Sequence, residues 1–460
     1  MISNGGLIPR RRALSRYLGV LGGSVITAAA VALAGGMPVM AAAATAPAAG
    51  SGGWSGPREL PGPRVITESG IFTALSCTSR SDCTAVGFYL GTHTGRMFAV
   101  TERHGVWGRA LNITAPTAAK NVSFGGDPVV SCASAGNCAA GDWYSVSGRE
   151  RGFVIAETNG TWGKAREVRR NPTAISCPAP GDCTAVLAGG FLVSEIHGTW
   201  RKAFPVPGRA ALRHGQPFNN FGAISCTSPG NCTAAGYFYL HSAASSRSFI
   251  LTQRHGIWGK AQPVRSSSGA GLAVSALSCP TAGSCVAGGT AFPLAGSGFG
   301  PFAVTEVHGR WGTARSLPGT FKFRYGIGQL ACTAAGECSA VGSVPPDQGG
   351  QALVSTETNG TWHSVQIITA ASPGPAPLAL GSLSCNAGGC VLAGDIVVRG
   401  GAQAAAAVQV NGRWGPARIL PGVSAGSGIA VVSCPARSRC TAVGFLGEFS
   451  SGHLFAVVQR

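Results

Sequence analysis

The chain has 460 residues, of which 45% are hydrophobic and only 11% are charged, with 70 glycines and 16 cysteines. A disordered chain is poorer in apolar residues and richer in charge, so this composition excludes an intrinsically disordered protein. The formal net charge of +18 favours attraction to anionic surfaces or polymers. Beyond the first 46 residues the basic side chains form no dense run, which argues against nucleic acid as a partner.

Residues 1–46 have the organisation of an export signal peptide. "PRRRALSR" supplies a basic region, the stretch from Tyr17 to Val39 is mostly apolar, and "MAAAATA" offers small-residue cleavage sites. The alternative is an uncleaved membrane anchor, because the apolar run approaches spanning length. Glycine interruptions and the Ala-x-Ala ending favour cleavage, so we expect a secreted, extracellular protein without a stable membrane anchor. Arg10 and Arg11 loosely resemble a twin-arginine signal, which leaves both that route and the general secretory route open.

The cysteines repeat along the chain. They form eight pairs, seven with five intervening residues and one with four, and the first cysteines of successive pairs are 51 residues apart on average. A period near fifty residues indicates a propeller or a similar array, with several strands in each unit. The pairs are Cys77 with Cys83, Cys132 with Cys138, Cys177 with Cys183, Cys226 with Cys232, Cys279 with Cys285, Cys332 with Cys338, Cys385 with Cys390, and Cys434 with Cys440.

Two further residue types repeat in phase with the cysteines. Eight of the nine tryptophans follow a glycine by two residues, and only Trp143 stands outside this pattern. Seven of those tryptophans also follow a glutamate or glutamine by five residues, and Gln459 occupies the same place near the chain end. The seven are Glu102, Glu157, Glu195, Gln253, Glu306, Glu357 and Gln409.

Each unit contains four short predicted strands, which in the first unit are "FTALSC", "CTAVGFY", "MFAVTE" and "VWGRALNI". After the signal the chain opens with "SGGWSGPREL", a fourth strand by itself, and it closes with three strands that lack a fourth. Joining the two ends completes the unit, as in a closed propeller that leaves no free sheet edge. We therefore predict an all-β fold: an eight-bladed β-propeller of four-stranded blades over residues 51–460, in which the N-terminal strand completes the last blade.

The cysteine pairs flank the predicted hairpin between the first two strands of each blade. Opposed residues there lie about 4.5–5.5 Å apart between Cα atoms, within the range of a disulfide. Zinc needs four ligands, whereas each hairpin offers two cysteines. We predict eight disulfides, with free buried thiols and then metal binding as the alternatives. The recurring histidines alternate with asparagine in the other hairpin, which is turn chemistry, and we expect neither metal nor cofactor.

The turn "STETNGTW" at 355–362 resembles the Asp-box of sialidase-like propellers. Ser355, Thr361 and Trp362 match that motif, while Glu357 replaces its aspartate and Gly360 falls one position late. The Asp-box is structural in that family, so the resemblance implies blade architecture and no activity. The whole repeat is similar to the Cys-rich repeat propellers of secreted actinobacterial proteins, which implies a fold and a location but no function.

One face of the predicted ring is uniform and the other is variable. The cysteine hairpins and the tight His-Gly or Asn-Gly turns share one face, whereas the second-to-third loops and the crossovers between blades occupy the other. Function usually lies on variable loops, and aromatic and basic side chains gather there, which suits sugar rings, peptides or anionic glycans. The alternative is that these aromatics pack between blades. The candidate ligand-binding residues are Trp143, Tyr144, Tyr89, Tyr239, His241, Arg324 and Tyr325.

The sequence offers little support for catalysis. Among its 17 carboxylates, Asp127 and Asp142 are the candidates for an acid/base pair facing the central channel, as glycoside cleavage requires. We find no phosphate-binding loop, histidine metal pair or nucleophile elbow. The leading hypothesis is a secreted, non-catalytic binding propeller whose partner is an anionic glycan or cell-envelope polymer. The alternatives are an exported polysaccharide hydrolase or lyase, and an extracellular scaffold that binds a surface protein.

Overall fold

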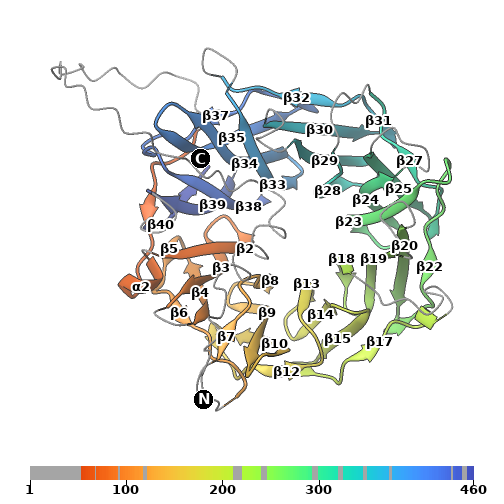
Figure 1. The fold of residues 1–460 in the computed structure, drawn as a ribbon, viewed down its shortest axis with the longest axis horizontal. Coiled ribbons are helices and arrows are strands. Elements are labelled where there is room, and N and C mark those ends of the chain that lie inside the picture. Colours follow the sequence, from red (N-terminus) through yellow and green to blue (C-terminus); the bar gives the residue numbers. More distant parts are fainter. Residues whose placement is uncertain are drawn as a thin grey trace, which may run out of the picture.

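The computed structural model shows eight antiparallel β-sheets arranged around one axis (Figure 1). We number these blades 1 to 8 from the sheet that begins with β2. The predicted eight-bladed propeller is therefore confirmed, whereas the predicted signal at residues 1–46 lies outside the described residues. The structure describes residues 53–67, 69–91, 94–117, 122–210, 220–239, 246–292, 299–319, 325–344, 350–371, 376–436, 439–447 and 453–459.

The first strand of each blade lies nearest the axis, and the second and third strands follow outward (Figure 1). The first strands are β2 (Gly70–Ser79), β8 (Val129–Ser134), β13 (Pro172–Ala179), β18 (Asn220–Ser228), β23 (Gly271–Thr281), β28 (Gln329–Ala334), β33 (Leu378–Asn386) and β38 (Gly428–Ala436). The second strands are β3 (Asp82–Leu90), β9 (Asn137–Val146), β14 (Asp182–Leu187), β19 (Asn231–Tyr239), β24 (Ser284–Phe292), β29 (Glu337–Val344), β34 (Gly389–Val398) and β39 (Arg439–Leu446). The third strands are β4 (Gly95–Arg103), β10 (Arg149–Thr158), β15 (Phe191–Ile196), β20 (Ser246–Arg254), β25 (Gly300–Val307), β30 (Gln351–Thr358), β35 (Gly401–Val410) and β40 (His453–Val458).

The outermost strand is split into two short pieces that both pair with the third strand, a break that the sequence did not predict. In blade 1 the N–H of Gly108 donates to the carbonyl of Thr101 at 2.9 Å, which bends the chain just after the tryptophan. The pieces that end at the tryptophan are β5 (Val106–Trp107), β11 (Thr161–Trp162), β16 (Thr199–Trp200), β21 (Ile257–Trp258), β26 (Arg310–Trp311), β31 (Thr361–Trp362) and β36 (Arg413–Trp414). The second pieces are β6 (Leu111–Asn112), β12 (Arg166–Val168), β17 (Phe204–Pro205), β22 (Gln262–Pro263), β27 (Arg315–Ser316), β32 (Gln366–Ile368) and β37 (Arg418–Ile419).

The ring closes as the sequence predicts. Strand β1 (Arg58–Glu59) pairs with β40, so that Arg58 lies opposite Ala456, and Trp54 forms an antiparallel bridge with Gln459. The N-terminal segment therefore supplies the fourth strand of blade 8. Two small elements complete the structure, the four-residue helix α2 (Arg64–Thr67) and strand β7 (Ser123–Phe124). Among the described residues, no helix has the length and apolar character to cross a bilayer.

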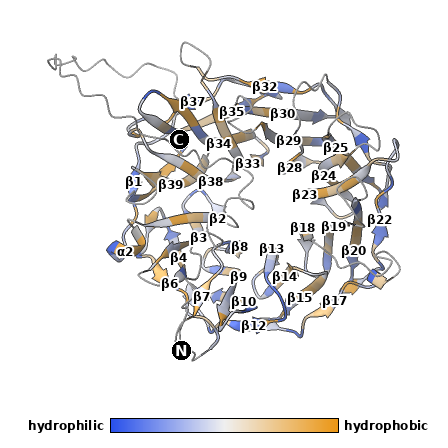
Figure 2. Cartoon of the chain, in the orientation of Figure 1, coloured by the Kyte–Doolittle hydropathy of each residue, from blue (hydrophilic) through white to orange (hydrophobic). Residues whose placement is uncertain are grey.

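The hydrophobic core consists of layers between adjacent blades. One layer joins Leu454 and Val443 of blade 8 to Phe72 and Phe98 of blade 1, and similar layers follow around the ring. Outer pieces such as β12 and β22 are largely exposed and carry hydrophilic residues (Figure 2). Burial of the middle strands on both faces explains their nearly continuous apolar runs.

All eight predicted disulfides are present, with Cα–Cα distances of 3.9–4.1 Å. The alternatives of free thiols and metal binding at these hairpins are therefore set aside, since no described cysteine is free. In blade 1 the two cysteines lie directly opposite one another in the first hairpin. The bonds join Cys77 to Cys83, Cys132 to Cys138, Cys177 to Cys183, Cys226 to Cys232, Cys279 to Cys285, Cys332 to Cys338, Cys385 to Cys390, and Cys434 to Cys440.

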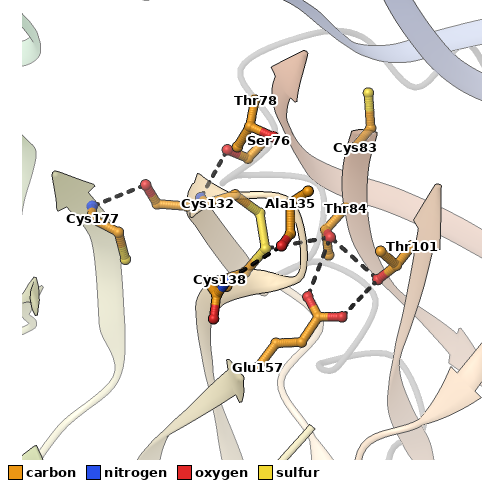
Figure 3. The surroundings of a disulfide bond; sticks show 12 residues. Ser76, Thr78, Cys83, Thr84, Thr101, Cys132, Ala135, Cys138, Glu157 and Cys177 are labelled. Atoms are coloured by element: carbon orange, nitrogen blue, oxygen red, sulfur yellow. Dashed lines mark hydrogen bonds between the residues drawn. A yellow bond between two sulfur atoms is a disulfide. The ribbon is translucent and has the colours of Figure 1, made fainter. Parts of the chain in front are cut away.

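The serine before the first cysteine links neighbouring blades. Oγ of Ser76 in blade 1 accepts a hydrogen bond of 2.9 Å from the N–H of Cys132 in blade 2 (Figure 3). The same Cys132 forms the disulfide with Cys138 that Figure 3 shows beside this bond. The disulfide within blade 2 therefore lies next to a hydrogen bond that joins blade 2 to blade 1.

The recurring glutamates and glutamines are buried on the third strands. Glu157 of blade 2 reaches blade 1, where its carboxylate accepts hydrogen bonds from Thr101 at 3.3 Å and Thr84 at 3.5 Å (Figure 3). Arg103 of blade 1 lies 3.6 Å from the same carboxylate. Gln409 of blade 7 makes the corresponding contact with Thr356 of blade 6. These residues are therefore part of the scaffold.

Candidate functional site

The two faces of the ring differ as the sequence predicts. On the face that we call the stapled face, the cysteine hairpin and the outer turn of one blade are bonded together. In blade 1 the N–H of Gly105 donates to the carbonyl of Ser81 at 2.9 Å, and the N–H of His104 donates to Oδ1 of Asp82 at 3.1 Å. His104 has a φ of 50°, and the other recurring histidines and asparagines adopt the same left-handed conformation. The predicted turn chemistry of these residues is confirmed.

The opposite face, which we call the variable face, carries the loops between second and third strands and the crossovers between blades. Two of the predicted ligand residues on it are buried in the blades. Tyr89 is 3% exposed and its hydroxyl donates to Oδ1 of Asn112 at 2.8 Å. Tyr144 is fully buried and its hydroxyl donates to Oε2 of Glu167 at 2.8 Å. Both tyrosines pack inside their blades, so neither offers a surface to a ligand.

Of three more predicted ligand residues, one is buried and two lie outside the described residues. Tyr325 is buried in a small cluster with Val344 and Leu353. His241 and Arg324 lie outside the described residues. The candidate binding surface therefore excludes Tyr325, and it retains Trp143 and Tyr239 from the original set.

Trp143 is half-buried and lies against the backbone of blade 2. A Cβ atom on Gly125 would fall 1.8 Å from Cε2 of Trp143, so the indole ring occupies the space that a side chain at this position would need. The N–H of Gly125 also donates to the carbonyl of Trp143 at 2.8 Å. The absence of a side chain at Gly125 therefore leaves room for the indole ring, and Trp143 keeps part of its surface accessible on the variable face.

Blade 4 carries a second accessible aromatic group. Tyr237 and Tyr239 project from the same side of β19, are both half-buried, and have ring centroids 5.3 Å apart with an angle of 70° between the rings. Phe238 between them points to the core and is 2% exposed. Burial raises the pKa of the Tyr239 hydroxyl to about 12, with Tyr237 contributing as a neighbour, so the hydroxyl stays protonated at neutral pH. Tyr237 was not among the predicted site residues.

Blade 3 contributes a cationic group that the sequence reading missed. The guanidinium groups of Arg169 and Arg209 each lie 4.8 Å from the ring centroid of Phe191. The two arginines come from the crossovers before and after blade 3, and Phe191 begins β15 after the tight Gly189–Gly190 turn. The sequence contained one usable signal for this group, an arginine in each of the two crossovers that flank blade 3. The phenyl ring of Phe191 therefore contacts two guanidinium cations, and this concentration of positive charge favours an anionic partner.

Asp127 and Asp142, the predicted acid/base pair, do lie near each other. Burial, aided by the charge of Asp127, raises the pKa of Asp142 to about 8. Asp142 is fully buried, and its Oδ1 accepts a hydrogen bond of 2.7 Å from the N–H of Trp143. Asp127 is half-buried, and burial raises its pKa as well. Only Asp127 has surface that a substrate can reach in this conformation.

The chain makes room for Asp142 by an irregularity in blade 2. Asp142 is the fourth residue after the second cysteine, where six other blades have glycine. In blade 1 this residue is Gly87, and a Cβ atom there would lie 2.0 Å from the carbonyl oxygen of Ile71 on the first strand. In blade 2 the first strand instead begins at Val129, and the backbone of Gly126 and Asp127 lies beside the carboxyl group of Asp142. Asp142 therefore supports the loop on which Trp143 rests.

The stapled face contains a shallow hollow of about 30 Å³ between blades 4 and 5. Its walls include Thr227, Gln253, Arg254 and the disulfide cysteines Cys279 and Cys285. These residues occupy repeat positions, so the hollow belongs to the scaffold. In the part of the chain that the structure describes, no three His, Cys, Asp or Glu side chains are grouped to hold a metal ion.

No protein-family model matches the chain, and no curated protein matches it in sequence. Several solved structures are similar in shape. YCF48 bound to D1 peptide has a TM-score of 0.40 and 14% identity, with coverage of 75% of this chain and 95% of that chain. Chaetomium thermophilum Sqt1, bound to the N-terminus of ribosomal protein L10, has a TM-score of 0.49 and 10% identity, with coverages of 87% and 100%. A PL25 ulvan lyase has a TM-score of 0.46 and 8% identity, with coverages of 86% and 94%.

Proposed function

We propose that this chain is a secreted, non-catalytic propeller that binds a glycan or another cell-envelope ligand through its variable face. Eight disulfides are typical of proteins that fold in an oxidising compartment outside the cytoplasm. The signal expected at residues 1–46 supplies the route of export. The scaffold is uniform around the ring, so the differences that give specificity lie in the variable loops.

The observation that carries the proposal is the half-exposed pair Tyr237 and Tyr239 on blade 4, with the partly exposed Trp143 on blade 2 of the same face. Aromatic rings that keep one accessible side are suited to the apolar C–H faces of sugars, while their hydroxyl and indole N–H groups supply hydrogen bonds. Blade 3 lies between these two blades and presents Arg169 and Arg209. The three blades together offer stacking surfaces on either side of a cationic centre, which suits an acidic sugar chain.

A glycan array that includes acidic cell-envelope polysaccharides tests the proposal. The variants Trp143→Ala and Tyr239→Ala remove the stacking surfaces, and we expect each to weaken binding about tenfold. Ile257→Ala is the control, because it removes an exposed apolar side chain from the stapled face. Absence of any glycan ligand, or equal binding by all three variants and the native protein, would contradict the proposal. Capture of a surface protein in place of a glycan would support the scaffold alternative.

Because Asp127 and Asp142 lie near each other, one catalytic alternative is open, in which the chain is an exported polysaccharide hydrolase or lyase. The reaction would depend on Asp127, since Asp142 is fully buried. If Asp127→Asn binds a polysaccharide normally but stops its cleavage, the alternative is correct. If the native protein binds the polysaccharide and leaves its length unchanged, the non-catalytic proposal stands.

A further inference from the structure

The stapled face carries a repeated surface pattern that neither the disulfides nor the turns require. Nine large aliphatic side chains are exposed among the described residues, and five of them flank the outer turn of five different blades. They are Val106, Ile196, Ile257, Val307 and Val410, with exposed fractions of 61%, 42%, 77%, 57% and 57%. Single exposed aliphatic residues are common on protein surfaces, but their recurrence at one turn of one face is not explained by chance scatter.

Four of these aliphatic residues face an arginine directly across the hairpin. In blade 4 the arginine comes first, and Arg254 pairs with Ile257. In blade 5 the order is reversed, and Val307 pairs with Arg310. Blade 1 follows the order of blade 4, and blade 7 follows the order of blade 5. Because the two residues exchange sides and remain together, the retained feature is a tip with one aliphatic and one cationic side chain.

The charges around these tips favour an anionic partner. The acidic residues Asp82, Asp182 and Glu337 lie in the adjoining hairpins, where each accepts a hydrogen bond from a backbone N–H of the outer turn. Arg310 and Arg413 are exposed, as is Arg80 in the cysteine hairpin of blade 1. These acids keep their negative charge, but the arginines at the tips and in the cysteine hairpin of blade 1 outnumber them. They are Arg80, Arg103, Arg254, Arg310 and Arg413.

We propose that the stapled face docks reversibly on the surface of an anionic lipid bilayer. The outer hairpins lie around the rim of the ring, so a flat partner contacts several tips at once (Figure 1). Val and Ile side chains gain from entering an apolar phase, which a polysaccharide lacks, and arginine suits the phosphate of lipid headgroups. Docking of this face would leave the variable face directed away from the membrane. Membrane docking and glycan binding use opposite faces, so each proposal can fail without the other.

Sedimentation of the mature chain with vesicles tests the apolar part of the proposal. We expect binding to vesicles of equal parts phosphatidylglycerol and phosphatidylcholine, and little binding to phosphatidylcholine alone. The triple variant Val106→Ser/Ile257→Ser/Val307→Ser should bind about tenfold more weakly. The control is Leu90→Ser, since Leu90 is 65% exposed at the end of β3 on the variable face. Failure of the native protein to bind the anionic vesicles would overturn the proposal.

A pair of charge variants tests the cationic part. Arg310→Gln/Arg413→Gln removes two charges from the tips of blades 5 and 7, and we expect at least about tenfold weaker binding and a smaller dependence on salt. Arg315→Gln/Arg418→Gln removes two exposed charges from the outer pieces β27 and β37 of the same blades and is the matched control. Equal losses in the two variants would show only a general effect of net charge and would overturn docking through the tips.

Discussion

The backbone N–H of Cys77 donates a hydrogen bond of 3.1 Å to Oγ of Ser433, which lies 356 residues away in the sequence. This bond joins blade 1 to blade 8, where the ring closes. Six other junctions have the same bond, between the serine before one first cysteine and the N–H of the next first cysteine. At the junction of blades 6 and 7, Ala331 stands in place of the serine.

Loss of the hydroxyl group at the closing junction should weaken the fold. Ser433→Ala leaves the N–H of Cys77 without its side-chain acceptor, and we expect the free energy of unfolding to fall by about 1 kcal/mol. Urea denaturation of the native and variant proteins measures the change. Ser316→Ala is the control, because Ser316 is exposed on β27. An equal, small effect of the two substitutions would show that the junction bond contributes nothing to stability.

The junction without a serine offers the reverse experiment. Ala331→Ser places a hydroxyl group at the position from which it reaches the next first cysteine in the other blades. We expect a gain of about 0.5–1 kcal/mol in the free energy of unfolding, since the N–H of Cys385 acquires an acceptor. Denaturant unfolding again provides the measurement. A loss of stability would mean that blades 6 and 7 are packed too closely here, around the bond from Leu383 N–H to Gln329, to accept the hydroxyl.

Each disulfide closes a short loop within one hairpin, so its removal should destabilise the ring without opening it. The variant Cys279→Ser/Cys285→Ser should lose about 2 kcal/mol by the chain-entropy estimate for a loop of seven residues. Thermal unfolding and far-ultraviolet circular dichroism would show a lower Tm with unchanged strand content. Loss of the folded state would indicate that the single disulfide between Cys279 and Cys285 is essential to the fold of the whole ring.

Buried carboxyl groups should make the protein more stable in mild acid than in base. Burial raises the pKa of Glu102 and Glu357 from 4.5 to about 7, and burial raises that of Asp142 to about 8. The folded protein therefore keeps protons that the unfolded chain releases, and this contribution is lost as the pH rises from about 4.5 toward 7 and 8. We expect a larger free energy of unfolding at pH 5 than at pH 8.

Glu357→Gln isolates one of these groups. Glutamine occupies the equivalent position in blades 4 and 7, as Gln253 and Gln409, so the substitution fits the scaffold. We expect it to stabilise the protein at pH 8 and to have little effect at pH 5, because the neutral amide needs no proton. Exposed Glu150→Gln is the control and should change neither value. The same gain at both pH values would argue against titration of Glu357 as the cause.

The fold was predictable because its markers repeat in phase. The closure between Trp54 and Gln459 follows from a fourth strand at one end of the chain and its absence at the other. The split in the fourth strand was not predictable from strand propensity, since "VWGRALNI" gives no sign that Gly108 turns back to bond with Thr101. The equivalent backbone hydrogen bond is present in other blades, as from Gly163 N–H to Ala156 and from Gly259 N–H to Thr252.

The candidate site was predictable only in part, because neighbouring strand residues point to opposite sides. Trp143 is accessible while the next residue, Tyr144, is fully buried. Tyr89, Tyr144 and Phe238 are each the sixth residue after a second cysteine, and all three are buried. Counting from the cysteine would thus have separated core aromatics from accessible ones. The contacts of Arg169 and Arg209 with Phe191 depend on crossover conformation, which the repeat pattern does not describe.

Eight disulfides close the hairpins of the ring, and we propose that the chain is exported; both proposed surfaces depend on this ring. The most direct test is the intact mass of the protein recovered from culture medium, after denaturation with an alkylating reagent and without a reductant. The account predicts a chain that lacks its signal segment, is lighter by the sixteen hydrogen atoms of eight disulfides, and carries no alkyl group. Alkylated cysteines, or retention of the full chain inside the cell, would contradict it.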